Sequence, residues 1–334
     1  MKLKHQLLIT LASFAMLPGC KKSGEKPSAI DVYTAGYVVA ANTHSVAAYW
    51  KNGTLVRLAD STFSSTANAI AVVGNDVYVV GNITNSEQIT IAVIWKNGAM
   101  TKLNEDASNS SDARAIAISG SDVYVAGFIN NLTATYWKNG VATTLASGAV
   151  ANAISVEGGN VYTAGFLFDT SISNNETVYW KNGTATELVV PTPGNAYDYI
   201  SGNASAISAS GSGIYVTGYA GGGKYWKNGT EVDLYNGYYC YPSAIAVNGS
   251  DVYIAGITDG AGPAYIPTAT YWQNGRAVPL TGSSISSYGY SIALNGADVY
   301  VGGAANGSAV YWKNEAEVEL APNGAVYSIA LVKH

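Results

Sequence analysis

Few residues of this chain are of the types that perform catalysis, and their spacing forms no familiar site. The three histidines are His5, His44 and His334, and the two cysteines are Cys20 and Cys240. No histidine lies near Cys240 in the sequence, so a Cys–His nucleophile has no support. The ligand spacing of zinc sites and the calcium-loop pattern are both missing from the sequence. We therefore expect no metal and no cofactor.

Scattered acidic residues leave one enzymatic alternative open. Glycoside hydrolysis uses two carboxyl groups about 5–10 Å apart. In this chain they would have to come from Asp169, Glu176, Asp198 and Asp259, which are far apart in the sequence. A polysaccharide-active enzyme therefore requires that two of these acids converge.

Two other sets of residues suit ligand binding. Arg114 is one of three arginines, and Asn68 and Asn152 occupy the equivalent position in other copies of the repeat described below. An arginine can hold a carboxylate with two hydrogen bonds, although a water-filled channel would also tolerate it without a role. The second set is eight tyrosines outside the repeated positions: Tyr197, Tyr199, Tyr235, Tyr238, Tyr239, Tyr241, Tyr288 and Tyr290. Exposed tyrosines suit sugar stacking or a protein hot spot; the alternative is that they pack long loops together.

The positions of these residues follow from a repeat that runs through most of the chain. Its pattern is A-I-A-V-x-G-x-D-V-Y-V-A-G, a variable stretch, and then Y-W-K-N-G-x-x-x-x-L. The mean spacing of about 43 residues is typical of four-stranded propeller blades. We predict an all-β fold: a seven-bladed β-propeller over residues 31–334, with four antiparallel strands, A to D, in each blade. All seven tryptophans occupy one repeat position: Trp50, Trp95, Trp137, Trp180, Trp226, Trp272 and Trp312.

The spacings divide the connections between two faces. The strand B Tyr follows the strand A Ile by eight residues, as Tyr78 follows Ile70. The strand D Leu follows each Trp by eight residues as well, as Leu58 follows Trp50. The B–C connection varies from 8 to 16 residues, and the D–A connection varies from 9 to 19 residues. In an up-and-down blade the A–B and C–D turns share one face, here named the tight-turn face. The opposite, variable-loop face carries the insertions, which usually mark a binding face.

Four blades carry an Asp at the start of strand B and a Lys at the end of strand C. We expect these residues to be cross-strand neighbours on the tight-turn face. A charged ring could dock a partner, but exposed pairs are more often solvated turn residues, worth about 0–1 kcal/mol each. The pairs are Asp31/Lys51, Asp76/Lys96, Asp122/Lys138 and Asp298/Lys313.

The two ends of the repeat are incomplete in complementary ways. The chain enters it with a strand B at residues 31–33 and leaves it with a strand A at residues 327–331. Pairing of the C-terminal strand A with the N-terminal strand B would complete a blade and remove the exposed edges. We predict that the ring closes in this way.

Residues 1–19 have the basic start and apolar run of a secretory signal peptide. Leu17-Pro18-Gly19-Cys20 then resembles a bacterial lipobox, although Pro18 stands where a small residue is usual. That resemblance implies a lipid on Cys20, a polar tether over residues 20–30, and membrane contact through the lipid anchor only. The alternative is an ordinary signal peptide followed by an incidental cysteine.

Lys21 favours the outer membrane, on its periplasmic or cell-surface side, because inner-membrane retention favours Asp at that position. Without residues 1–19 the chain has 15 basic and 22 acidic residues, and three of the basic residues are arginines. This mildly acidic balance argues against nucleic acid as a partner. We expect a monomer.

The strand order resembles that of WD-repeat propellers, with Y-W-K-N-G where those proteins have their Trp-Asp turn. Lys follows the Trp here and the Gly-His pair is missing, so the signature differs. The chain is more similar to uncharacterised bacterial lipoproteins with D-V-Y-V-A-G and Y-W-K-N-G repeats, a likeness that implies no activity. The first hypothesis is a non-enzymatic cell-envelope scaffold that binds a glycan or an envelope protein. A polysaccharide-active enzyme and an envelope assembly factor are the alternatives.

Overall fold

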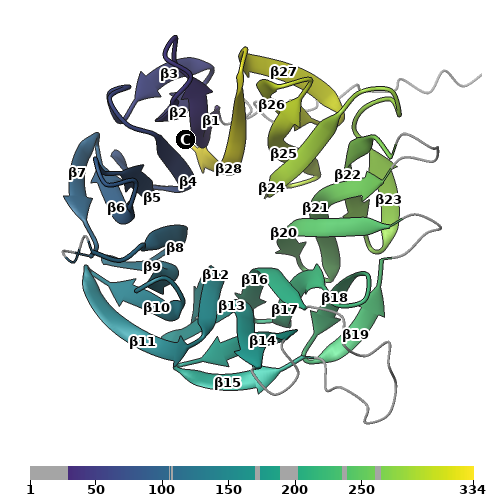
Figure 1. Cartoon of the computed structure of the whole chain (residues 1–334). Coiled ribbons are helices and arrows are strands. Elements are labelled where there is room, and N and C mark those ends of the chain that lie inside the picture. Colours follow the sequence, from purple (N-terminus) through teal and green to yellow (C-terminus); the bar gives the residue numbers. More distant parts are fainter. Residues whose placement is uncertain are drawn as a thin grey trace, which may run out of the picture.

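The computed structural model describes residues 29–104, 106, 108–169, 174–188, 202–234, 239–259 and 265–334. These residues form a ring of seven four-stranded antiparallel sheets (Figure 1), which confirms the predicted seven-bladed β-propeller. Blades are numbered 1 to 7 in chain order. Among the described residues, no helix is long and apolar enough to cross a membrane.

Each blade runs from an inner strand A near the ring axis to an outer strand D (Figure 1). Blade 1 is β28 (Gly324–Lys333), β1 (Ile30–Val39), β2 (Ser45–Lys51) and β3 (Thr54–Arg57). Blade 2 is β4 (Ser65–Val73), β5 (Asp76–Thr84), β6 (Thr90–Lys96) and β7 (Ala99–Lys102). Blade 3 is β8 (Asp112–Ser119), β9 (Asp122–Ile129), β10 (Thr133–Lys138) and β11 (Val141–Ser147). Blade 4 is β12 (Ala149–Glu157), β13 (Asn160–Asp169), β14 (Asn174–Lys181) and β15 (Thr184–Glu187).

The remaining blades follow the same order. Blade 5 is β16 (Asn203–Ser210), β17 (Gly213–Tyr219), β18 (Gly223–Lys227) and β19 (Thr230–Asp233). Blade 6 is β20 (Cys240–Asn248), β21 (Asp251–Asp259), β22 (Pro267–Gln273) and β23 (Arg276–Pro279). Blade 7 is β24 (Ser287–Asn295), β25 (Asp298–Ala305), β26 (Ser308–Lys313) and β27 (Ala316–Ala321).

The core lies between neighbouring blades. The seven tryptophans are almost fully buried, with 0–1% of each side chain exposed. Trp95 of blade 2, for example, shares one apolar cluster with Tyr33 and Ala47 of blade 1. Burial between sheets explains why the inner strands read as nearly continuous apolar runs.

The ring closes as predicted. β28 pairs antiparallel with β1, from Ile30 opposite Lys333 to Val38 opposite Gly324. The backbone N–H of His334 also donates to the carbonyl of Ala29, at 3.1 Å. The two ends of the ring therefore meet beside the tight C–D turn of blade 1.

Candidate functional site

A β-bulge in the inner strand of every blade positions the residues of interest. In β4, Ala67 lies opposite Gly81 and Ala69 lies opposite Val80, so Asn68 is the extra residue between them. A bulge adds one unpaired residue and redirects its side chain. All seven bulged residues are partly exposed, and the residue before each is buried. The bulged residues are Tyr327, Asn68, Arg114, Asn152, Ser205, Ser243 and Tyr290, in blades 1 to 7.

The repeated glycine of the D-V-Y-V-A-G motif accommodates this bulge. A Cβ on Gly81 would overlap the carbonyl oxygen of Thr66, which lies two residues before the bulged Asn68. The equivalent overlap arises at the matching glycine of every other blade: Gly36, Gly127, Gly165, Gly218, Gly256 and Gly303. A side chain at this position is therefore excluded by the neighbouring backbone.

We define the rim as the seven bulged residues together with the residues two positions before them. The earlier residues are Ala325, Thr66, Asp112, Val150, Asn203, Tyr241 and Tyr288, in blades 1 to 7. All fourteen lie on inner strands at the end next to the D–A connections. The rim therefore surrounds the ring axis on the variable-loop face.

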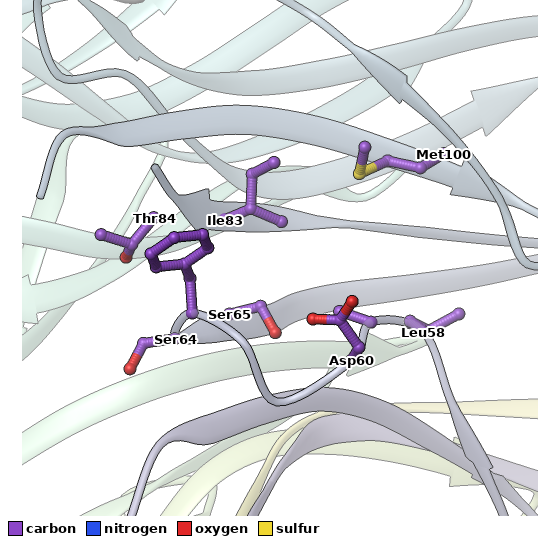
Figure 2. Close-up of a pocket in the computed structure, with 9 residues that line it drawn as sticks. Leu58, Asp60, Ser64, Ser65, Ile83, Thr84 and Met100 are labelled. Carbon is purple, nitrogen blue, oxygen red and sulfur yellow. The ribbon is translucent and has the colours of Figure 1, made fainter. Parts of the chain in front are cut away.

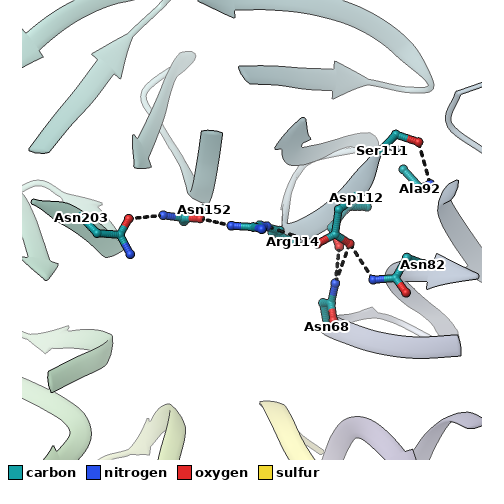
Figure 3. Close-up of polar contacts among 9 residues, drawn as sticks. Asn68, Asn82, Ala92, Ser111, Asp112, Arg114, Asn152 and Asn203 are labelled. Atoms are coloured by element: carbon teal, nitrogen blue, oxygen red, sulfur yellow. Dashed lines mark hydrogen bonds and ion pairs between the residues drawn. The ribbon is translucent and has the colours of Figure 1, made fainter. Parts of the chain in front are cut away.

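Blades 2 to 5 contribute a connected polar arc to the rim (Figure 3). Asn68 donates to the carboxylate of Asp112 at 2.9 Å, and Arg114 Nε lies 3.2 Å from the other oxygen of the same carboxylate. Arg114 Nη1 donates to Asn152 Oδ1 at 2.6 Å, and Asn152 Nδ2 donates to Asn203 Oδ1 at 2.6 Å. The structure thus joins Asn68, Arg114 and Asn152 in one network.

The positive charge of Arg114 is neutralised by an acid of the same strand. The guanidinium forms an ion pair with Asp112 and lies over the ring of Phe128, 5.2 Å from the ring centroid. Asp112 also accepts a hydrogen bond from Asn82, at 2.8 Å. The bulge places the counter-ion of Arg114 two residues before it on the same strand.

Blades 7 and 1 contribute an aromatic arc. The rings of Tyr288 and Tyr290 are stacked, with centroids 5.8 Å apart, and Tyr290 meets Tyr327 edge-on at 5.1 Å. Tyr37 of β1 packs against Tyr327 at 5.7 Å. Burial raises the pKa of Tyr327 to about 12, and burial also raises the pKa of Tyr290. Burial thus favours the neutral phenol at both positions.

The other predicted tyrosines are dispersed. Tyr241 stacks on Tyr219 of the preceding blade at 5.1 Å, and Tyr239 is 59% exposed. Tyr241, Tyr288 and Tyr290 belong to inner strands rather than to loops. Tyr197, Tyr199, Tyr235 and Tyr238 lie outside the described residues.

Sequence reasoning missed Tyr327 and Tyr37, and one signal could have found the first. Every bulged residue lies two positions before the strand A isoleucine, as Arg114 does before Ile116 and Tyr327 does before Ile329. Alignment on that isoleucine places both tyrosines of the bulge, Tyr290 and Tyr327, in the same ring as Arg114.

The Asp/Lys pairs of the tight-turn face are present as expected, with N–O distances of 2.8–3.4 Å. Each lysine of these pairs also lies over the repeat tyrosine of its blade, 5.0–5.3 Å from the ring centroid. The side chains that would form a docking ring are thus engaged with one another. We interpret them as elements of the turn.

Cys240 occupies a structural position. It lies five residues before the strand A isoleucine, where Ser65 and Ser287 accept backbone N–H groups from the preceding blade. Its thiol is buried, and burial raises its pKa to about 11. A thiol in this state is a poor nucleophile.

Three of the four acids considered for glycoside chemistry lie within the described residues. Asp169 and Glu176 share one hairpin, and burial together with the neighbouring Glu187 and Asp169 raises the pKa of Glu176. Asp259 is in blade 6, and Asp198 lies outside the described residues. The described residues contain no cluster of three or more His, Cys, Asp or Glu side chains that could hold a metal.

A separate hollow of about 300 Å³ lies where the D–A connection of blade 1 meets blade 2 (Figure 2). Leu58, Phe63, Ile83 and Met100 give it an apolar lining, and Asp60 lies at its border. Phe63 and Met100 are 38% and 46% exposed. This hollow is peripheral to the rim.

Comparison with known proteins shows the fold alone. No protein-family model and no curated protein matches the chain. A puromycin-hydrolysing peptidase of Mycobacterium tuberculosis is similar in structure (TM-score 0.55, 11% identity, 88% of this chain and 52% of that one). A puromycin hydrolase gives a TM-score of 0.54 at 9% identity, over 91% of this chain and 54% of that one. This chain therefore spans about half the length of either hydrolase.

The β-propeller domain of the Trilobed protease from Pyrococcus furiosus matches over nearly its whole length (TM-score 0.52, 10% identity, 89% of this chain and 96% of that one). That domain has an open velcro topology, whereas β28 and β1 close the ring here. These likenesses agree with the strand topology, and together they establish the chain as a seven-bladed β-propeller.

Proposed function

We propose that this protein is a non-enzymatic, lipid-anchored binding protein of the bacterial cell envelope, which takes its glycan or protein ligand on the variable-loop face. The observation that carries the proposal is the rim. Seven bulges direct one partly exposed side chain from each blade to the same end of the ring. Concave sites that combine aromatic surface with a few convergent polar groups are typical of ligand binding.

The course of the chain at the start of the ring supports this orientation. Asp31, at the start of β1, contacts Lys51 and Asn52 of the tight C–D turn. A tether from Cys20 would therefore reach the ring at its tight-turn face. The variable-loop face would then point away from the membrane, toward ligands in the periplasm or outside the cell.

Anchoring is tested with Cys20→Ser. The unchanged chain should incorporate labelled fatty acid and fractionate with the outer membrane, and the variant should do neither. A variant that still carries the label would contradict lipidation at Cys20.

The binding face is tested by steric blocking. Tyr239→Cys places a thiol on the variable-loop face, and Val141→Cys is the matched control beside a tight turn, where Val141 is 71% exposed. The buried Cys240 should not react with a maleimide. The full chain in a sugar-free detergent is then assayed against a glycan array and solubilised envelope proteins.

A polyethylene glycol attached at residue 239 should abolish binding, and the same group at residue 141 should not. If only the polymer attached at residue 141 abolished binding, the ligand would lie on the tight-turn face. Failure to bind any member of either class would contradict the scaffold, and release of reducing ends from a polysaccharide would favour the enzymatic alternative.

A further inference from the structure

The two arcs of the rim adjoin one another. β28 of blade 1 and β4 of blade 2 are in contact, and Ser328 Oγ accepts the backbone N–H of Ile70 at 3.2 Å. Tyr327 and Asn68 are the bulged residues of these two strands. A ligand of a few ångströms at this junction would therefore contact both the tyrosine arc and the polar arc.

The rim is electrically neutral. Asp112 and Arg114 are the charged members of its fourteen residues, and they form an ion pair with each other. An anionic ligand would meet a guanidinium that already binds Asp112 and Asn152. A cationic ligand would meet a carboxylate that already accepts from Asn68, Asn82 and Arg114. The rim thus offers no uncompensated charge to either.

The chemistry of the two arcs suits a ligand with an apolar face and a hydroxylated edge. Tyrosine rings present flat apolar surface with a polar tip. Amide, carboxylate and guanidinium groups are planar donors and acceptors that can address two adjacent hydroxyl groups. A pyranose ring combines these features, with C–H bonds on its faces and hydroxyl groups around its edge.

We infer that the rim binds an uncharged sugar ring, stacked on the Tyr290/Tyr327 arc and hydrogen-bonded to the side-chain oxygen of Asn68, whose amide nitrogen donates to Asp112 and Ala113. This inference rests on the proposed function, because it names the ligand class for the same face. It also excludes glycans whose recognition depends on a carboxylate, such as polyuronates. The ion pair of Asp112 with Arg114 determines that exclusion.

The test compares neutral and uronic-acid oligosaccharides of matched length, titrated into the full chain in a sugar-free detergent. The unchanged chain should prefer the neutral series. Tyr290→Ala and Asn68→Ala should each weaken neutral binding by about tenfold or more, since each removes one contact of the sugar. Tyr265→Ala is the control, because Tyr265 is 67% exposed on the same face and lies outside the rim.

A charge variant keeps the inference testable if Tyr290→Ala, a change in a packed cluster, does not fold. Asp112→Asn leaves the guanidinium of Arg114 without its counter-ion. This variant should gain affinity for the uronic-acid series by about fivefold or more. The gain should shrink as salt is added, because salt screens exposed charges.

The outcomes separate the two proposals. A preference of the unchanged chain for uronic-acid oligosaccharides would overturn the inference and leave the binding role intact, as would neutral binding that neither rim variant reduces. An Asp112→Asn variant with no gain for the uronic-acid series would also overturn the charge argument. Failure to bind any sugar while an envelope protein binds would overturn the inference alone.

Discussion

At the scale of single residues, one glycine in each blade decides whether the inner strand can bulge. Gly81 faces the carbonyl oxygen of Thr66 so closely that a methyl group has no room. The same backbone contact aims Asn68 at its partners in blade 3. The glycine of the motif is therefore a positioning element for the rim.

Gly81→Ala should destabilise the protein by about 3 kcal/mol, because the inner strand must shift to relieve the overlap. Gly211→Ala is the matched control: its Cβ would meet no atom within 4 Å. The control should change stability by less than about 0.5 kcal/mol. Chemical denaturation of both variants measures the difference, and equal stabilities would refute the steric argument.

Asp31, which lies where the ring closes, makes the stability of the ring depend on pH. Asp31 accepts from Asn52 at 2.7 Å and lies 3.0 Å from His334 and 3.2 Å from Lys51. The hydrogen bond from Asn52, followed by that from His334, lowers the pKa of Asp31 to about 2. Because the folded state holds the carboxylate, its contribution to stability is complete above the ordinary pKa of 3.8 and is lost as the pH falls toward 2.

Asp31→Asn should therefore lower the melting temperature at pH 6. The gap between variant and unchanged chain should narrow between pH 4 and pH 2, within the window set by the two pKa values. Melting curves recorded by circular dichroism across that range measure the gap. A gap of constant size from pH 6 to pH 2 would show that the charge of Asp31 contributes nothing.

At the scale of elements, the C–D hairpin shows how a repeated turn is encoded. The Asn of each C–D turn has a left-handed φ of 47–51°, and its Oδ1 accepts the backbone N–H of the residue just before the strand B Tyr of its blade, as Asn97 does from Val77. Six of the seven turns continue with Gly, also at positive φ, which is the usual Asn-Gly hairpin. Blade 7 departs from this pattern, because Glu315 occupies the glycine position at a φ of 70°.

Glu315→Gly should stabilise the protein by about 1 kcal/mol, because it relieves a left-handed conformation that costs a side chain about that much. Glu315→Ala removes the charge and keeps the strained backbone, so its melting temperature should stay near that of the unchanged chain. Thermal unfolding of the pair distinguishes the causes. A stabilised Ala variant would assign the effect to charge instead of backbone.

At the scale of the whole molecule, the ring depends on one non-local pairing. β28 is the inner strand of blade 1, and it packs against both blade 7 and blade 2. Its apolar residues Val326 and Ile329 are buried. Without β28, β1 would expose an edge and the ring would open.

Deletion of residues 325–334 should therefore abolish the cooperative unfolding transition. Deletion of His334 alone, which keeps the paired strand, should preserve it. Differential scanning calorimetry of both truncations is the measurement. A long truncation that melts like the intact chain would refute closure by this strand.

The repeat spacing was enough to predict the ring and its closure, because equal spacings require equal blades. The Asp/Lys pairs followed from hairpin register. The bulge could not be predicted in the same way, since an extra residue appears only when a strand is compared with its partner. For that reason the sequence alone did not reveal that Asp112 pairs with Arg114, or that Tyr288 and Tyr290 are strand residues of the rim.

The contact between His334 and Ala29 brings the two ends of the ring close enough to be joined, so the chain could begin at a different blade. The two ends of the ring occupy the place that a short A–B turn occupies in the other six blades, so this break is one of seven equivalent positions. A circular permutant that joins His334 to Ala29 by a short linker and opens at Gly74, where an added Cβ would meet no atom within 4 Å, should build the same ring. Its new ends would still emerge at the tight-turn face. The order of the blades around the axis is thus essential to the rim, whereas the blade with which the chain begins is interchangeable.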